Sequence, residues 1–416
     1  MTATVKKWLS RVVKFGFCAA AVWYLSTKVS LNDHARLAAA PDKAYTLVQQ
    51  TGDTLLLRDP DTNQERTASA SELADRVKLK KGQQAIELGL RSLARGAERS
   101  WLGWAILLMG PTTFFMAWRL KLLLAVQEIA IGLRVSTLLT FAGNFFNFAM
   151  PGTTGGDLYK AYHIAKLTHK RTEGVTVVFL DRVIGLISFL ILASLAMLLA
   201  HRQNMLGDYG RWVGYLLIGL FVAGGLYFSR RVRGLIRYEA LLLSMPLADK
   251  LRRVDETAFS FRYHPRQAVA SLAVTLVSHL FMVSSIFFLA RSLGIGPHGT
   301  HDYGDMYLAI MLSVFVGYLF AAIPISIQGF GLLEAVFVRV LVEGGWSSMN
   351  QMLALTLGAR LVQILWALPG VIVPWMGMPR PPEGATQAAD DTGAAAVTSD
   401  SDAPVSNASV HSAPRG

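Results

Sequence analysis

Charged residues are scarce in this sequence, and that shortage limits the kinds of protein it can encode. Asp, Glu, Lys and Arg make up 16% of its 416 residues, and 52% of the residues are hydrophobic. Soluble domains carry about a quarter of their residues as charges. The composition therefore predicts an all-α fold, a polytopic bundle of transmembrane helices, rather than a soluble domain.

Cysteine is almost absent, and so are the motifs of several enzyme classes. Cys18 is the only cysteine, so neither an internal disulfide nor a cysteine-based metal site can form. No Ser/His/Asp or paired-carboxylate arrangement has a plausible catalytic spacing. No basic run is interleaved with aromatic residues outside the apolar segments. We therefore expect no enzymatic activity, no cofactor, no metal and no binding to nucleic acid.

Positive charge exceeds negative charge, with a net charge of +12 from 40 Lys and Arg against 28 Asp and Glu. In membrane proteins such an excess gathers in cytoplasmic loops and attracts anionic lipids. The cations are densest between Arg230 and Arg266. We predict a multi-pass protein of the cell inner (cytoplasmic) membrane, with both termini in the cytoplasm and with anionic-headgroup lipids as partners.

Four regions can be separated by composition. Residues 1–31 carry cations before an apolar run, which favours a signal-anchor helix over a cleaved signal peptide. Residues 32–99 form a polar insert, expected to be a small extracytoplasmic α+β module. Residues 100–379 form the transmembrane domain. Residues 380–416 are rich in Pro, Ala, Ser and Asp and are expected to be a disordered cytoplasmic tail.

The pattern within these regions predicts individual elements. In the insert, two strands flank the Thr51-Gly52-Asp53 turn, and Ser69 with Glu72 forms a capping box before a helix. Arg119 and Lys121 are interpreted as markers of the cytoplasmic side, followed by an interfacial helix at Leu122–Ile131. The expected strands are Tyr45–Gln50 and Thr54–Arg58. The expected membrane spans are Trp101–Trp118, Val175–Ala200, Trp212–Ser229, Ala268–Ala290 and Leu353–Met376.

Two apolar segments are interrupted by proline and glycine, one in each half of the chain. The first runs from Asn144 to Lys160 and the second from Ala322 to Glu334. A helix cannot stop in lipid, because each freed backbone group would cost several kcal/mol, but it can stop beside a wet cavity. Broken helices of this kind build substrate sites in transporters. We therefore predict two broken or re-entrant helical hairpins.

The first interruption, Pro151 to Asp157, is glycine-rich but lacks the Gly-Lys-Ser/Thr of a phosphate-binding loop. One interpretation is an unwound turn whose free amides open a helix at Asp157 and bind a phosphate headgroup. The other is a tight turn between two structural helices. The residues alone leave both interpretations open.

Charges within apolar segments mark further candidates. Asp181 and Arg182 would each cost roughly 2.5–3.5 kcal/mol if unpaired at the centre of a membrane helix. Arg182 is interpreted as a grip for a lipid phosphate, balanced by Asp181 or by Glu334; the alternative is a structural ion pair. Arg339 and Arg360 are weighed in the same way.

Histidines are the remaining residues with possible chemistry. His279, on an apolar helix, is interpreted as a packing residue, with a proton carrier as the alternative. His298, His301 and Asp302 are metal ligands by type, but a polar loop is the favoured interpretation.

These motifs together resemble a known family. Asn147-Phe-Ala-Met-Pro151-Gly152, the glycines before Asp157, Lys160 and then Asp181-Arg182-Val-Ile-Gly185 are similar to the flippase-like transmembrane family, named after the membrane half of lysylphosphatidylglycerol synthases. The segment from Pro324 to Glu334 resembles its second signature. The resemblance covers roughly residues 100–376. It implies movement of lipids between leaflets, without the soluble aminoacyltransferase domain, and it does not account for the 32–99 insert.

The expected function is binding and translocation of a phospholipid or polyprenyl-phosphate-type lipid across the cytoplasmic membrane. The alternative is a non-transporting subunit that scaffolds or regulates an envelope-lipid or glycolipid enzyme, and a membrane-embedded transferase is a third option. An envelope-biosynthesis protein or a second copy of the chain is a further candidate partner. The predicted substrate-binding residues are Asn147, Pro151, Gly152, Gly155, Gly156, Asp157, Lys160, Asp181, Arg182, Gln328, Gly329, Gly331, Glu334 and Arg360.

Overall fold

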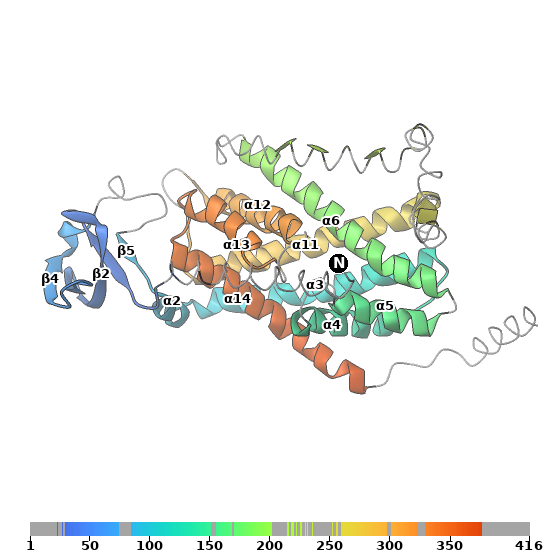
Figure 1. Ribbon diagram of the computed structural model, residues 1–416, viewed down its shortest axis with the longest axis horizontal. Helices are drawn as coiled ribbons and strands as arrows, with labels where there is room; N and C mark the ends of the chain where they lie inside the picture. Colours follow the sequence, from blue (N-terminus) through green and yellow to red (C-terminus); the bar gives the residue numbers. More distant parts are fainter. Residues whose placement is uncertain are drawn as a thin grey trace, which may run out of the picture.

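The computed structural model describes residues 30–74, 85–150, 155–168, 170–201, 259–297, 301–322 and 329–376, with single positions within 23–27 and 214–256. It consists of a bundle of long helices with a small β-sheet at one end (Figure 1). The predicted tail at 380–416 lies outside the described residues, and so does the predicted anchor helix at 1–31 apart from a few positions. The predicted span at Trp212–Ser229 is described only at scattered positions.

Five helices of the described residues are long and apolar enough to cross a membrane, which confirms the multi-pass prediction. They are α3 (Arg99–Val126), α6 (Arg171–His201), α11 (Pro265–Ser292), α12 (Tyr303–Ala321) and α14 (Met349–Ala367), the last of which continues through η5 (Leu368–Val371) and η6 (Val373–Trp375). Four of the predicted spans therefore coincide with helices, which extend beyond the predicted ends because apolar windows underestimate polar helix termini.

A stripe of serines joins α3 to α11 along their lengths. Serine recurs at every seventh position of α11 from Ser271 to Ser292, which places these side chains on one face. Ser278 Oγ donates to the carbonyl of Thr112 at 3.3 Å, and Ser285 Oγ donates to that of Ala105 at 2.6 Å. Small hydroxyl side chains let two helices approach closely while adding interhelical hydrogen bonds. This antiparallel pair forms the rigid centre of the bundle.

Two helix pairs that the sequence marks as interrupted lie in opposite halves of the bundle. The first is α4 (Leu133–Ala149) with α5 (Gly155–Leu167), and it lies in the half farther from the sheet (Figure 1). The second is α12 with α13 (Leu332–Phe337), which is followed by the π-helical turn η4 (Val338–Val342) and lies in the half nearer the sheet. The sequence predicted an interruption in each pair, and in both pairs the first helix ends several residues before the second begins.

The predicted interfacial helix at Leu122–Ile131 is wrong. Its first half continues α3, and the chain turns only at Gln127–Ile131. Leu123 and Leu124 are fully buried, because they pack with Leu139 of α4 and Ile164 of α5 in a second apolar cluster. Apolar residues that looked suited to a membrane surface therefore serve the contact between α3 and the first helix pair.

The insert folds as a five-stranded antiparallel sheet in the order β4-β3-β2-β1-β5. The strands are β1 (His34–Leu37), β2 (Ala40–Thr51), β3 (Thr54–Arg58), β4 (Glu65–Ser69) and β5 (Ile86–Glu87). Both predicted strands are confirmed, with Gly52 at φ +60° in the turn between them. The capping box of Ser69 and Glu72 is also confirmed, but it caps only the short 3-10 helix η1 (Ala70–Glu72).

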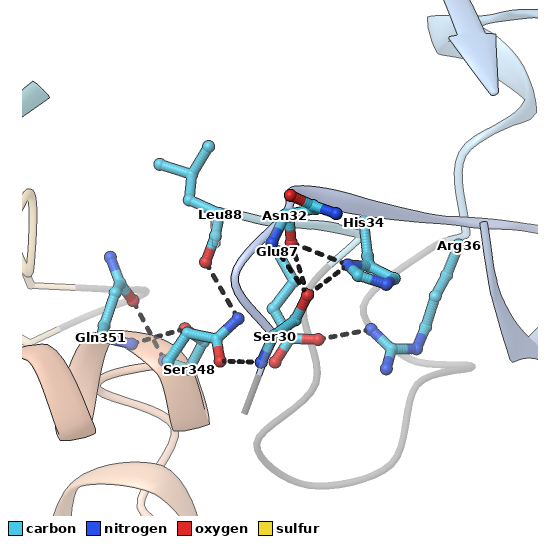
Figure 2. A network of polar contacts seen from close by, with 9 residues as sticks. Ser30, Asn32, His34, Arg36, Glu87, Leu88, Ser348 and Gln351 are labelled. Carbon is cyan, nitrogen blue, oxygen red and sulfur yellow. Dashed lines mark hydrogen bonds and ion pairs between the residues drawn. The ribbon is translucent and has the colours of Figure 1, made fainter. Parts of the chain in front are cut away.

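One buried asparagine fastens the sheet module to the bundle. Asn350, in the first turn of α14, accepts a hydrogen bond from the Ser30 amide at 3.0 Å and donates to the Leu88 carbonyl at 3.0 Å. Figure 2 shows the surrounding network from Ser30 and His34 to Ser348 and Gln351. After Leu88 the short helix α2 (Leu90–Gly96) leads into α3. Asn350 thus joins the segment before the module and the segment after it to the same helix, α14.

Candidate functional site

The first helix pair is closed by direct contact between its backbones. Gly156, at the start of α5, donates its amide to Asn147 Oδ1 of α4 at 2.9 Å. A Cβ at Gly156 would lie 1.9 Å from the Gly143 carbonyl oxygen, so only glycine permits this approach. Gly155 also lies close to α4, because a Cβ there would be 2.7 Å from the Phe146 carbonyl oxygen. Pro151 and Gly152 lie outside the described residues.

This contact corrects one expectation from the sequence. One of the two interpretations of this interruption has free amides that bind a phosphate headgroup, and for the Gly156 amide that is wrong. This amide is satisfied by the Asn147 side chain, which acts as the cap of the second helix. Asn147 and Gly156 therefore shape the tip of the pair.

Arg182 reaches the tip from α6. It lies eleven residues into that helix, about 16 Å from its start at ~1.5 Å per residue. Its guanidinium forms an ion pair with Asp157 in the first turn of α5, and the two side chains are 37% and 18% exposed. The structure thus brings together two predicted site residues that are far apart in the sequence.

Asp181 has a different partner from its neighbour. Consecutive helical residues point roughly 100° apart, so Asp181 faces α3, where Arg119 Nε donates to its Oδ1 at 2.5 Å. The two side chains are only 7% and 5% exposed, and Arg119 also donates to Thr275 of α11 at 3.4 Å. Arg119, which the sequence suggested as a marker of the cytoplasmic side, is thus a buried link between three long helices.

The second helix pair carries a matching ion pair. Glu334, in the first turn of α13, accepts from the Gly331 amide at 2.7 Å and from Arg360 Nη2 of α14 at 2.9 Å. Glu334 is 2% exposed, and the Arg360 guanidinium lies 3.7 Å from the Phe330 ring centroid. Gly329 and Gly331 have φ of +72° and +86°, which L side chains rarely adopt.

This geometry overturns the predicted Arg182–Glu334 pair. Each residue has a partner on its own side of the molecule, Asp157 for Arg182 and Arg360 for Glu334. Arg339 pairs with Glu343 on the exposed surface, away from both tips. Gln328 lies outside the described residues.

The two helix pairs follow the same plan. In each, an acidic residue stands in the first turn of the returning helix and pairs with an arginine on the next long helix. The separation is 26 positions for Glu334 and Arg360 and one position less for Asp157 and Arg182. The pairs lie in opposite halves of the bundle (Figure 1). The two halves of the chain therefore share one acid–arginine plan.

Lys160 is a buried charged residue on the first helix pair. It lies one turn beyond Asp157 on α5 and is 5% exposed. Its stem crosses α4 at Gly143, where a Cβ would be 2.5 Å from Lys160 Cε. Gly143 was not among the predicted residues, although it makes room for both Gly156 and Lys160. The signal that could have marked it is a single glycine in the middle of an apolar helix.

The histidines occupy structural positions. His279 is 1% exposed, is hydrogen bonded to Ser188 Oγ at 2.8 Å and stacks on Phe189. His301 Nδ1 lies 3.1 Å from Asp305 Oδ2, and Asp302 caps the start of α12. His298 lies outside the described residues. Among the residues that the structure describes, no group of three or more His, Cys, Asp or Glu side chains is arranged to hold a metal.

Another ion pair joins the turn after α3 to the start of α6. Lys170, just before α6, donates to Glu128 at 2.6 Å and to the Gln127 carbonyl at 3.2 Å. The hydrogen bond from Lys170 lowers the pKa of the Glu128 carboxyl, because it stabilises the charged carboxylate. It links the end of α3 to the start of α6, beside the first helix pair.

Residues 88–370 match the family described as the lysylphosphatidylglycerol synthase TM region. The chain belongs to this family. It is thus a multi-pass membrane protein of a lipid-related family, and the matched range contains both helix pairs and every predicted site residue. The match begins after the β-sheet, which is therefore an addition to the family's common region. No curated protein sequence matches the chain at a significant level.

Proposed function

We propose that this protein binds the headgroup of a membrane lipid between its two interrupted helix pairs and carries it across the bilayer. The substrate is a phospholipid or a polyprenyl-phosphate-type lipid, and the role is transport rather than catalysis. The observation that carries the proposal is that each helix pair, in its own half of the bundle, is joined to a long helix by an acid–arginine pair.

The physical reason is the cost of interrupted helices in lipid. Backbone groups freed at a tip are tolerated at membrane depth only inside protein or beside water, and interrupted helices of this kind flank the midplane sites of transporters. An arginine that is already paired can exchange its carboxylate for a phosphate, because its planar guanidinium binds both in a similar way. Arg182, whose side chain is 37% exposed, is placed for such an exchange.

We also propose an orientation, with the sheet module outside the cytoplasmic membrane and both termini inside. The cation-rich segment at 230–266 and the first helix pair are then cytoplasmic. In a Cys18→Ser background, Gln64→Cys should react with an impermeant thiol reagent added to intact cells, and Asp255→Cys should react only after lysis. The reverse labelling would place the first pair on the outer side.

The proposal is tested by translocation in reconstituted vesicles. Fluorescent analogues of phosphatidylglycerol, phosphatidylethanolamine and a polyprenyl phosphate are placed in one leaflet, and their appearance in the other is followed by quenching. At least one lipid should cross about tenfold faster than in protein-free vesicles. Protein-free rates for all three lipids would contradict transport and favour a scaffolding or regulatory role.

A further inference from the structure

Exposed arginines gather where the sheet module meets the bundle. Arg91 and Arg95 lie one turn apart on α2, Arg99 begins α3, and all three residues are exposed. The Glu98 amide donates to the Ser292 carbonyl at 2.9 Å, which brings the end of α11 to the same place. The junction between module and bundle, marked by α2 in Figure 1, therefore presents several cations at one end of the helices.

Aromatic rings hold a fourth arginine at this end. The Arg291 guanidinium lies 5.2 Å from the ring centroid of Trp101 and 4.1 Å from that of Tyr303. Trp101 stacks on Phe288, with the centroids 5.5 Å apart, and Trp104 is 52% exposed on the next turn of α3. Trp and Tyr of membrane helices concentrate at the level of the lipid headgroups. These rings therefore mark the depth at which the headgroups lie.

The acidic residues beside the arginines have other partners. Asp33 accepts hydrogen bonds from the Gly89 amide at 2.7 Å and from Ser92 Oγ at 2.9 Å. Glu98 accepts from Ser100 Oγ at 2.7 Å, and the capping box at the start of α12 engages both acidic residues there. In the part of the chain that the structure describes, none of the four arginines forms an ion pair. Their guanidinium groups are therefore available to an external anion.

Apolar side chains are exposed next to the arginines. Leu31 and Leu88 are 54% and 41% exposed, and the Leu31 carbonyl accepts from the Arg91 amide at 3.4 Å. Basic and apolar side chains combine in this way on segments that lie in a membrane interface. The cation-rich segment at 230–266 leads into the other end of α11. The usual excess of cations on the cytoplasmic side therefore does not explain arginines at both ends of the bundle.

We infer that the four arginines of the junction bind anionic lipid headgroups in the leaflet on the module's side and so hold the module at the membrane surface. A guanidinium binds a phosphate through two parallel hydrogen bonds, and each arginine near an anionic surface strengthens the attraction by about fivefold. The inference requires only that the helices span a membrane. It does not rest on transport, because these lipids are bound at the surface and are not the substrate.

Fluorescence quenching in nanodiscs tests this inference on the full-length protein. In a Cys18→Ser background, Ala94→Cys carries a dye on the exposed side of α2. Phosphatidylglycerol or phosphatidylcholine, spin-labelled near the headgroup, is added at equal mole fraction to phosphatidylcholine discs. The Stern–Volmer constant should be at least about fivefold larger for the anionic lipid, the factor expected for a single arginine. Equal quenching by the two lipids would overturn the inference.

The variant Arg91→Gln/Arg95→Gln/Arg99→Gln shows whether the junction is responsible. It should lose the preference for phosphatidylglycerol while keeping the Tm of the wild type in neutral detergent, because substitutions of exposed side chains cost little stability. A triple variant that keeps the full preference would contradict the assignment to these arginines.

The matched control removes the same charge from the sheet. Lys43→Gln/Arg58→Gln/Arg66→Gln replaces three cations that are each paired with a carboxylate of the module. This variant should keep the preference for phosphatidylglycerol. An equal loss in both triple variants would mean that net charge, and not the junction, attracts the lipid, which would defeat the inference.

Salt provides a test that needs no substitution at the junction. Raising the ionic strength from about 0.1 M to about 1 M shortens the Debye length from roughly 10 Å to roughly 3 Å. The preference of the dye-labelled protein for phosphatidylglycerol should then weaken severalfold. A preference that is unchanged at high salt would show that exposed arginines do not cause it.

Discussion

Replacing Gly156 with alanine is expected to separate α4 from α5 and to lower the free energy of unfolding by about 3 kcal/mol or more, at the upper end of what overpacking costs. The added Cβ would lie 1.9 Å from the Gly143 carbonyl oxygen and 2.6 Å from its carbon. Because both atoms belong to the backbone, no side-chain rotation can relieve the overlap. The helices must move apart, which also breaks the hydrogen bond from the Gly156 amide to Asn147.

Gly103→Ala provides the matched control. Gly103 lies in α3, where an added Cβ meets nothing within 4 Å, and alanine is favoured over glycine in helices by up to about 1 kcal/mol. Thermal unfolding in detergent should therefore show Gly103→Ala unchanged or slightly stabilised and Gly156→Ala strongly destabilised. Equal stability of the two variants would mean that α4 and α5 do not meet as closely as described.

The second large effect is expected at the Arg119–Asp181 pair. Removing either partner by Arg119→Met or Asp181→Leu leaves a buried charge uncompensated, which costs about 3–5 kcal/mol. The double substitution should recover most of this loss, because an apolar pair of similar volume replaces a desolvated ionic pair. The measurement is a double-mutant cycle from denaturant or thermal unfolding.

An exposed pair on the same molecule gives the comparison. Arg339 and Glu343 have side chains that are 40% and 39% exposed, and Arg339→Met should cost at most about 1 kcal/mol. If the Arg119→Met and Asp181→Leu losses simply add in the double variant, the two residues do not act as a pair.

Features that depend on neighbouring residues could be predicted from the sequence. The turn at Gly52 defined β2 and β3, the capping box was visible as Ser69 with Glu72, and proline and glycine marked both interruptions. Each of these signals is local, because backbone conformation and capping involve residues within a few positions.

Pairing between distant residues could not be predicted in the same way. The sequence gives no reason to join Arg182 to Asp157 rather than to Glu334, since the choice depends on which half of the bundle each tip occupies. The buried partner of Arg119 could not be predicted, because a cation near the end of an apolar run looks like an interfacial residue until the helix is known to continue to Val126. The serines at every seventh position of α11 can be seen in the sequence. They identify α3 as the partner helix only when the structure places the two helices side by side.

The central claim is that the tethered first tip moves lipid rather than merely holding the fold. The most direct test is the translocation rate of the Asp157→Asn/Arg182→Gln double variant, measured at equal amounts of folded protein. The pair is partly exposed, with 18% and 37% of the side chains accessible, so its loss should cost the fold only about 1 kcal/mol or less. The account predicts a Tm within a few degrees of wild type, at roughly 2–4 °C per kcal/mol, and translocation at least about tenfold slower. A well-folded double variant that translocates at the wild-type rate would contradict it.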